Sequence, residues 1–256
     1  MKQDPKDTTS DLSGRTTIVV GASRGLGRGI ATAFAVAGAP VVAVARTATT
    51  FAEPRKGADI IQTEVADAAD ATVAGSLLDR YEPQAIILVA GASPLMRPLQ
   101  HQTWETFSIN WHSDVRIAFH WLREALLKPL PPGSRVVVVS SGAALAGSPL
   151  SGGYAGAKAT QRLITGYAQE EAQRAGLGIT FTAVLPQITP LTELGRPAVR
   201  AYAARSGQSE EEYLRQIGEP LTPEAAGAAI VELLRADVAT IAPAYLLTGA
   251  GLQKLP

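Results

Sequence analysis

Short apolar segments alternate along the chain with longer segments that have the spacing of amphipathic helices. Most of the apolar segments lack a polar side, which is typical of strands buried on both faces of a sheet. We predict seven strands, at 16–20, 41–45, 59–65, 85–90, 135–140, 179–185 and 244–248. Helices are predicted between them, near 27–37, 69–80, 103–127, 154–175 and 223–234, the last with Thr222 as its N-cap and Pro223 at its first position. This alternation predicts an α/β fold in which a parallel sheet is covered by helices on both faces.

Composition narrows the class of protein. The 256 residues suffice for one large domain, which we expect over 14–256 after a flexible tail at 1–13. The 23 basic and 23 acidic residues form no basic run, so we expect neither a nucleic acid nor a membrane surface as partner. Cysteine is absent, which excludes disulfides and thiolate chemistry. We see no secretory signal and no long apolar stretch, so we expect a cytoplasmic protein.

The segment 190–220 interrupts the alternation of strands and helices. It follows the strand at 179–185, at the carboxyl end where open α/β sheets bind ligands. Ser209 and Glu212 have the spacing of a capping box, which predicts a short helix there. We interpret the segment as an insertion that closes over a substrate, the alternative being a surface excursion that packs on the core.

A glycine-rich turn follows the first strand. It reads GASRGLG over 21–27 and leads directly into a predicted helix. Glycines at this spacing let the backbone approach a pyrophosphate, and the N terminus of the following helix directs N–H groups at the same anion. Since the strand before and the helix after are both predicted, we interpret the turn as a dinucleotide-binding loop. The alternative is a tight turn without a ligand.

The second strand indicates which dinucleotide is bound. Enzymes that prefer NAD carry an acidic residue about 20 residues beyond the glycine-rich turn, where it holds the ribose hydroxyls. Here that strand ends in Ala45-Arg46-Thr47, so a cation stands where an acid is expected. Arg24 adds a second cation inside the turn. Two charge-assisted contacts to a 2′-phosphate, each worth about 1.5–3 kcal/mol, would favour NADP; the alternative is that both arginines are solvated.

Three residues near the fifth strand have the chemistry of proton transfer. Ser141 follows that strand, Tyr154 comes 13 residues later, and Lys158 lies four further along, on the same face of a helix. A phenol alone is a poor base at neutral pH, but a nearby ammonium favours its ionised form. Such a tyrosine can protonate a carbonyl oxygen or deprotonate an alcohol, while Ser141 holds the same oxygen.

With this set the chain resembles the short-chain dehydrogenase/reductase family over nearly its whole length. The resemblance rests on GASRGLG, on the spacing of Ser141, Tyr154 and Lys158, and on the order of strands. It implies a single-domain Rossmann fold, with Tyr154 as the acid/base, Lys158 on the nicotinamide ribose hydroxyls and Ser141 on the carbonyl. It also implies that Asn110 bends the long helix and anchors a proton-relay water.

The resemblance further implies a set of cofactor-binding positions. Glu64 and Val65 match a pair that contacts adenine. The complete set expected to bind NADP(H) is Gly21, Ser23, Arg24, Gly25, Leu26, Gly27, Arg46, Glu64, Val65, Ala90, Gly91, Tyr154, Lys158, Pro186 and Thr189.

The chain departs from the family in three places. Val20 replaces a threonine before the glycine-rich turn, and Leu88-Val89 replaces an asparagine pair after the fourth strand. Because both sides of that polar contact between strands are lost together, the replacement can be nearly neutral. Gln187 replaces a glycine after the sixth strand, and we expect Thr189, with Thr192 as alternative, to contact the nicotinamide carboxamide.

We therefore expect an NADP(H)-dependent oxidoreductase that interconverts a carbonyl and a secondary alcohol of a small, mostly uncharged organic substrate. The alternatives are a catalytically silent nucleotide-binding scaffold or sensor, and a reductase of an imine or enoyl group. The three histidines are scattered, so we expect no metal site. The resemblance also implies a homodimer or homotetramer.

Overall fold

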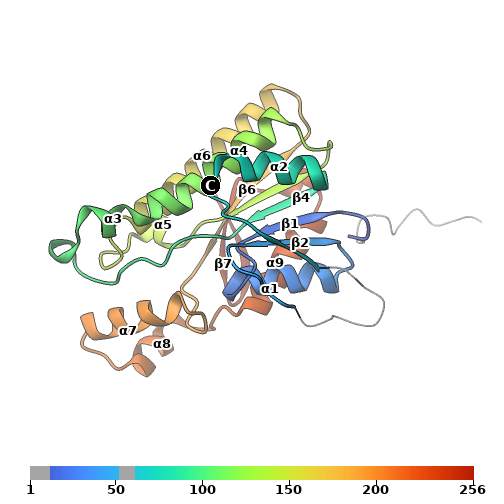
Figure 1. The fold of residues 1–256 in the computed structure, drawn as a ribbon. Coiled ribbons are helices and arrows are strands. Elements are labelled where there is room, and N and C mark those ends of the chain that lie inside the picture. Colours follow the sequence, from blue (N-terminus) through green and yellow to red (C-terminus); the bar gives the residue numbers. More distant parts are fainter. Residues whose placement is uncertain (1–11, 52–60) are drawn as a thin grey trace, which may run out of the picture.

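The computed structural model describes residues 12–51 and 61–256, and its strands join into one sheet (Figure 1). The strands are β1 (Thr17–Val20), β2 (Val41–Ala45), β3 (Ile61–Val65), β4 (Ala85–Leu88), β5 (Arg135–Val139), β6 (Thr180–Pro186), β7 (Ala244–Thr248) and β8 (Gly251–Leu255). Their order is β3-β2-β1-β4-β5-β6-β7-β8. Because β1 pairs with both β2 and β4, the order of strands reverses there, and sheets of this kind bind ligands at the carboxyl ends of the strands beside such a point.

The predicted parallel sheet is confirmed, with one addition. The strands β1 to β7 are parallel, and β8 pairs antiparallel with β7, with Thr248 opposite Gly251. A two-residue turn, Gly249-Ala250, joins these strands, and the Ala250 N–H donates to the Thr248 hydroxyl at 3.2 Å. The strand β8 was not predicted from the sequence, because its short segment is only partly apolar. Positions 59–60 of the predicted third strand lie outside the described residues.

Helices cover both faces of the sheet. They are α1 (Gly25–Val36), α2 (Ala71–Tyr81), α3 (Trp104–Asn110), α4 (Arg116–Leu127), α5 (Ala143–Ala146), α6 (Tyr154–Arg174), α7 (Gly195–Arg205), α8 (Glu210–Ile217) and α9 (Pro223–Arg235). In Figure 1, α1 and α9 lie side by side below the sheet, and α2, α4 and α6 lie above it. The helices α7 and α8 pack on each other and stand apart from both layers.

Two helix starts that the sequence predicts have the expected capping bonds. The Thr222 hydroxyl accepts a hydrogen bond from the Ala225 N–H at 3.1 Å, with Pro223 at the first position of α9. The Ser209 hydroxyl accepts from the Glu212 N–H, and the Glu212 carboxylate accepts from the Ser209 N–H, which completes the capping box of α8. Each bond satisfies an N–H group that has no partner within its helix.

The core divides into two layers because neighbouring strand residues point to opposite faces. Val19 of β1 packs in the layer that α1 and α9 cover, whereas Ile18 and Val20 pack in the layer under α2, α4 and α6. Trp121 of α4 is fully buried in the second layer, and its indole N–H donates to the Ala68 carbonyl at 3.2 Å. Burial on both faces explains why these strands read as continuous apolar segments.

The predicted long helix at 103–127 is not continuous. The helix α3 ends at Asn110, a π-helical turn η2 (Trp111–Val115) follows, and α4 begins at Arg116. The change of helix type therefore occurs at the residue where the resemblance implies a bend. Single π-helical turns within α-helices occur often at functional sites.

The boundary that the sequence predicts for the N-terminal tail is wrong at one residue. Leu12 belongs to the predicted tail at 1–13, but it is only 1% exposed and packs in the core layer of α1 and α9. The Arg15 N–H also donates to the Leu12 carbonyl at 3.0 Å. Residues 1–11 of the predicted tail lie outside the described residues.

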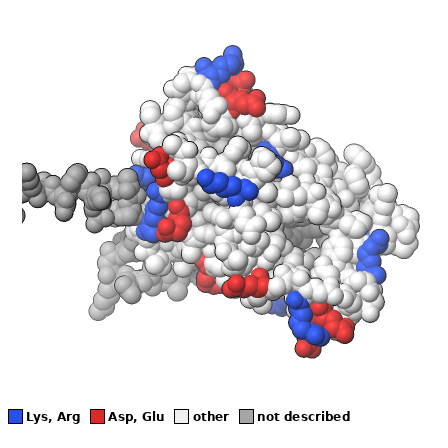
Figure 2. Space-filling model, turned by 180° about the vertical axis from the view of Figure 1, so that it is seen from behind, with Lys and Arg blue, Asp and Glu red and all other residues white. Residues whose placement is uncertain are grey.

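Charged side chains are scattered on the face that Figure 2 shows, where small basic and acidic groups are separated by wide uncharged areas. No helix among the described residues is long and apolar enough to cross a membrane. Within the same residues, no cluster of three His, Asp or Glu side chains has the arrangement of a metal site.

Shortening the Leu12 side chain tests whether this residue anchors the domain. We expect Leu12→Ala to lower the free energy of unfolding by about 2–5 kcal/mol, because it leaves a cavity in the core. Val36→Ala is the matched control, since Val36 is 70% exposed and its change should stay within about 0.5 kcal/mol. Urea denaturation followed by tryptophan fluorescence measures both, and equal stability of the two variants would place Leu12 outside the core.

Candidate active site

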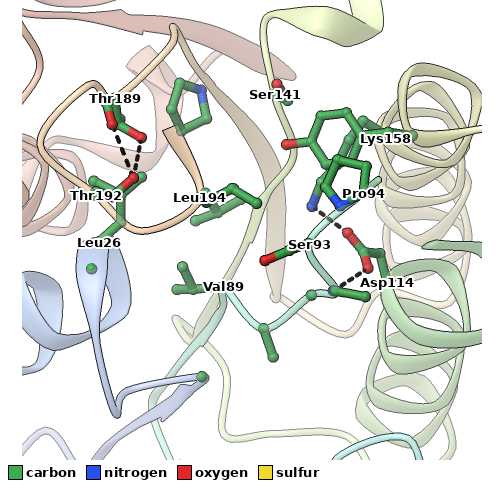
Figure 3. A pocket seen from close by; sticks show the side chains of 18 of the residues that line it. Leu26, Val89, Ser93, Pro94, Asp114, Ser141, Lys158, Thr189, Thr192 and Leu194 are labelled. Carbon is green, nitrogen blue, oxygen red and sulfur yellow. Dashed lines mark hydrogen bonds and ion pairs between the residues drawn. The ribbon is translucent and has the colours of Figure 1, made fainter. Parts of the chain in front are cut away.

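A cavity of about 730 Å³ opens at the carboxyl ends of the parallel strands. It runs from the glycine-rich turn after β1, past the segments that follow β4 and β5, to the N-terminal end of α6. The segment after β6, with parts of α7 and α8, forms another wall. Figure 3 shows Ser141, Lys158 and Asp114 on one side, with Thr189 and Thr192 across from them. This size is typical of ligand-binding pockets in proteins.

The glycine-rich turn forms one end of the cavity and fits a pyrophosphate. Gly21 has φ of 91°, which favours glycine, and a Cβ there would lie 2.6 Å from the Cα of Ala90. The helix α1 begins just after Arg24, and no side chain caps its N terminus. Its first N–H groups and its dipole therefore remain available to an anion.

Most of the positions that the resemblance assigns to the cofactor line this cavity. They are Gly21, Ser23, Arg24, Gly25, Leu26, Gly27, Arg46, Ala90, Gly91, Tyr154, Lys158, Pro186 and Thr189. Their shared location follows from the fold, because each is at or just beyond the carboxyl end of a strand, or in the first turn or two of α1 or α6.

Glu64 and Val65, which the resemblance assigns to the adenine contact, lie beside the cavity, and that contact stays a prediction. Neither residue lines the cavity, and the next residues along the chain, 66–69, line it instead. The Glu64 carboxylate accepts hydrogen bonds from Arg80 and Tyr81, on the side of α2. Val65 is 60% exposed. Since both residues are still within β3, the wall of the cavity begins only after that strand ends, at Ala66.

The two predicted phosphate-binding arginines differ in their surroundings. Arg46 is exposed just after β2, and among the described residues it has no hydrogen-bond or ion-pair partner. Arg24 forms an ion pair with Glu193, with 2.5 Å between the guanidinium nitrogen and the carboxylate oxygen. Both side chains of this pair are more than half exposed, at 63% and 70%. An exposed pair contributes about 0–1 kcal/mol, less than a charge-assisted bond to a phosphate, so it does not preclude that role.

Ser141, Tyr154 and Lys158 line the same part of the cavity. Ser141 follows β5, and its hydroxyl accepts a hydrogen bond from the Ala143 N–H at 3.2 Å. Tyr154 is the first residue of α6, and the Lys158 Nζ lies 5.6 Å from the centre of its ring. The Ser140 hydroxyl donates to the Lys158 carbonyl at 2.7 Å and fixes α6 to the end of β5. The structure thus brings the three predicted residues to one wall.

The ion partner of Lys158 was not predicted from the sequence. The Lys158 Nζ lies 3.0 Å from the Asp114 Oδ2, and the two side chains are only 5% and 1% exposed. Burial alone lowers the pKa of Lys158, but the nearby Asp114 carboxylate and Tyr154 oxygen outweigh it and raise the pKa above its ordinary value. Lys158 is therefore a protonated cation at neutral pH. An acidic residue four positions after Asn110, on a helix lined with apolar residues, was the available signal.

Asn110 lies behind the cavity wall and does not line it. Its side-chain amide is fully buried and donates to the Ala92 carbonyl at 2.7 Å and to the Asp114 Oδ1 at 3.2 Å. Its Oδ1 has no hydrogen-bond partner among the described residues. The amide thus fixes the segment after β4, and its role in a proton relay stays a prediction.

The departures from the family pattern are accommodated by backbone contacts. The Val89 and Ala90 N–H groups both donate to the Val20 carbonyl at 2.9 Å. The Gln187 amide donates to the Glu219 carbonyl at 3.0 Å. The hydroxyls of Thr189 and Thr192 lie 2.9 Å apart, and both residues line the cavity, so either remains a candidate for the carboxamide contact.

The insertion at 190–220 forms α7 and α8 and contributes Leu194, Ala198, Tyr202 and Tyr213 to the cavity wall. The sequence predicted only the second of these helices, because α7 has no side-chain cap at its start. The rings of Tyr202 and Tyr213 are stacked, with 6.4 Å between their centres. The Tyr202 hydroxyl lies 2.6 Å from the Ser148 hydroxyl and so ties α7 to the loop after α5.

Comparison with known proteins shows one family. The family model described as short chain dehydrogenase matches residues 15–203. The hydroxynaphthalene reductase-like protein Arp2 of Metarhizium majus is 28% identical over 198 residues, which cover 71% of this chain and 70% of that protein. The L-xylulose reductase of Mesocricetus auratus is 30% identical over 105 residues, 41% of this chain and 43% of that protein.

Solved structures share the fold at lower identity. A short chain dehydrogenase from Mycobacterium avium has a TM-score of 0.75 and 22% identity, over 96% of this chain and 86% of that one. A short chain dehydrogenase from Leptospira borgpetersenii with bound NAD+ has a TM-score of 0.75 and 16% identity, over 97% of both chains.

Removing one partner of the buried ion pair tests its contribution to stability. We expect Lys158→Met to lower the free energy of unfolding by about 3–5 kcal/mol at neutral pH, because the Asp114 carboxylate is left buried without a cation. The double variant Lys158→Met/Asp114→Asn should recover much of this loss, since no charge is then left buried. Urea denaturation measures both, and an equal loss in the single and double variants would contradict the explanation.

Proposed function

The chain belongs to the short-chain dehydrogenase family, and on that premise we propose that it is an NADP(H)-dependent oxidoreductase acting on a carbonyl or secondary alcohol. One observation carries the proposal. A hydroxyl, a phenol and a buried ammonium, from Ser141, Tyr154 and Lys158, line the same cavity as an uncapped helix N terminus behind a glycine-rich turn. Groups suited to proton transfer and to anion binding thus line the same cavity.

The residues of this chain have separate tasks in the proposed reaction. A bound nicotinamide supplies or takes up the hydride. Ser141 holds the substrate oxygen by a hydrogen bond, and Tyr154 gives that oxygen a proton in reduction or removes one in oxidation. Lys158 stabilises the ionised phenol by its charge and has one N–H left for a ribose hydroxyl, since its other two contacts are Asp114 and Gln161.

We assign the cofactor preference to Arg46 and Arg24. Arg46 stands unpaired among the described residues at the end of β2, where an NAD-preferring enzyme carries an acid. Both arginines line the cavity beside the N terminus of α1. The bound NAD+ of the Leptospira borgpetersenii relative shows that related chains take the other cofactor, so the preference for NADP rests on these side chains of this chain.

The substrate is proposed to be a small, mostly uncharged organic molecule beneath α7 and α8. The cavity is also lined by Pro94, Met96, Ala146 and Leu194, which offer apolar contact. Tyr202 and Tyr213 add aromatic surface from the proposed lid. Two relatives are named reductases, which supports the reductive direction.

A homodimer or homotetramer is proposed from the outer faces of α4 and α6. Phe119, Leu163 and Tyr167 are each more than half exposed there, at 53%, 56% and 58%. Large apolar side chains gathered on neighbouring helices are typical of surfaces that a second protein covers.

Removing the phenol oxygen tests the proposed reaction. We expect Tyr154→Phe to lower turnover of ketones and secondary alcohols at least 100-fold, because the group that moves the proton is lost. NADPH binding, measured by fluorescence titration, should stay nearly intact. Absorbance at the reduced-nicotinamide band follows turnover, and product analysis separates carbonyl from imine or enoyl reduction. Unchanged turnover would remove Tyr154 from the mechanism, and no turnover by the unaltered chain would favour a silent scaffold.

Removing one cation tests the proposed cofactor preference. We expect Arg46→Ala to weaken NADP binding roughly 10- to 100-fold while NAD binding changes little, since a charge-assisted contact to a phosphate is worth about 1.5–3 kcal/mol. Isothermal titration with both cofactors measures the effect. Arg174→Ala is the control, because Arg174 is an exposed cation on α6 that pairs with Glu171. Equal weakening of both cofactors in Arg46→Ala would contradict the assignment.

A further inference from the structure

The carboxylate of Asp114 lies in a fixed position at the inner wall of the active site. Asp114 belongs to the π-helical turn η2 and is fully buried. Its Oδ1 accepts hydrogen bonds from the Ala92 N–H at 2.9 Å and from the Asn110 side chain at 3.2 Å. A Cβ on Gly91 would lie 2.5 Å from its Oδ2, so the glycine leaves the room that the carboxylate occupies. The position of the charge is therefore determined by three neighbouring residues.

The same carboxylate orients the Lys158 ammonium. The Asp114 Oδ2 lies 3.0 Å from the Lys158 Nζ, and the Gln161 Oε1 accepts from that Nζ at 2.9 Å. The Gln161 amide in turn donates to the Asp114 carbonyl at 2.9 Å. Lysine has three donors, so two are engaged in this closed arrangement. Figure 3 shows the ion pair and the bond from Asp114 to the segment after β4 as one connected chain of contacts.

We propose that Asp114 is a positioning residue that holds the Lys158 ammonium and, through its charge, sets the pH at which the Tyr154–Lys158 pair gives up its proton. The role in turnover rests on the proposed function, whereas the effect on the proton does not. Asp114 lines the same cavity, and it acts through its contact with Lys158 and, by its charge, on Tyr154.

The sign of the effect follows from charge alone. When the pair loses a proton from either member, its charge becomes more negative beside a buried carboxylate. Asp114 opposes that loss in both cases, because burial weakens the screening between these groups. Removing the carboxylate must therefore shift the loss of the proton to lower pH, whether it leaves from the phenol or from the ammonium.

The surroundings supply few other charges that could obscure this effect. Within the part of the chain that the structure describes, Asp114 and Tyr154 are the charged or titratable groups that act on Lys158. His112 of the same π-helical turn also lines the cavity. Arg116 and His120 of α4 act on Asp70 at the start of α2. Asp67, Arg24, Arg46 and Glu193 line the cavity at the end near the glycine-rich turn or the segment after β6.

Two substitutions that change the charge beside Lys158 in opposite directions test the proposal. Asp114→Asn removes the charge and keeps an oxygen for the Ala92 N–H, and we expect the alkaline limb of the pH profile to move down by about one unit or more. Gln161→Glu adds a negative charge at the other contact of Lys158, and the limb should move up. The second variant keeps the test valid should the first fail to fold. Glu170→Gln, at an exposed position on α6, is the control and should leave the limb in place.

A second readout does not depend on turnover. The absorbance change of phenol ionisation is followed with pH for each chain, and the same titration of its Tyr154→Phe counterpart is subtracted. The proposal is supported if Asp114→Asn lowers, and Gln161→Glu raises, both the pH of the alkaline limb and the midpoint of the absorbance titration. If Asp114→Asn lowers turnover by the same factor at every pH, with the alkaline limb and the absorbance midpoint unmoved, the proposal is overturned and Asp114 is only a clamp on the segment after β4. Should the unaltered chain turn over no carbonyl or alcohol, the proposed function fails, and the absorbance titration alone decides the inference.

Discussion

The parallel direction of β1, β4, β5 and β6 is the constraint on which the site depends. Parallel strands end at the same edge of the sheet, so residues 21, 91, 141 and 187, far apart along the chain, emerge beside one another. Each strand is buried on both faces, and slipping any of them by one residue would move its side chains into the wrong core layer. The register of the core therefore fixes the positions of the glycine-rich turn and of Ser141, before any contact within the site contributes.

A buried charge distinguishes this site from a merely well-packed cleft. Taking the Lys158 ammonium and the Asp114 carboxylate out of water is expensive, and their mutual attraction offsets that only with good geometry and additional hydrogen bonds. The second condition is met in part, because Ala92 and Asn110 donate to the Asp114 Oδ1 and Gln161 accepts from the Lys158 Nζ, while the Asp114 Oδ2 has the ion pair alone. Hydrophobic residues of similar volume would be at least as stable, so the pair is better explained by a task in the site than by stability.

The sequence predicted the elements well, because buried strands, glycine turns and helix caps are local signals. The starts of α8 and α9, the seven parallel strands and the shared wall of Ser141, Tyr154 and Lys158 follow from such signals. The features that the sequence did not predict depend on contacts between distant parts of the chain, or on helices that begin without a capping residue. Leu12 is buried only because distant elements cover it, and α7 begins without a capping side chain. Glu64 matches the pair that contacts adenine in the family, but its carboxylate bonds to Arg80 of α2. No local sequence pattern predicts that contact.

The segment after β4 is held by polar contacts that differ from those of the family pattern. In the family pattern, a threonine before the glycine-rich turn and an asparagine pair after the fourth strand join neighbouring strands; here Val20, Leu88 and Val89 make that contact apolar. The segment is held instead at Ala92, whose N–H and carbonyl bond to Asp114 and Asn110. The polar anchor of this segment therefore lies at η2 and at its boundary with α3. Because that anchor includes a carboxylate, the residue that supports the loop also brings a negative charge to Lys158.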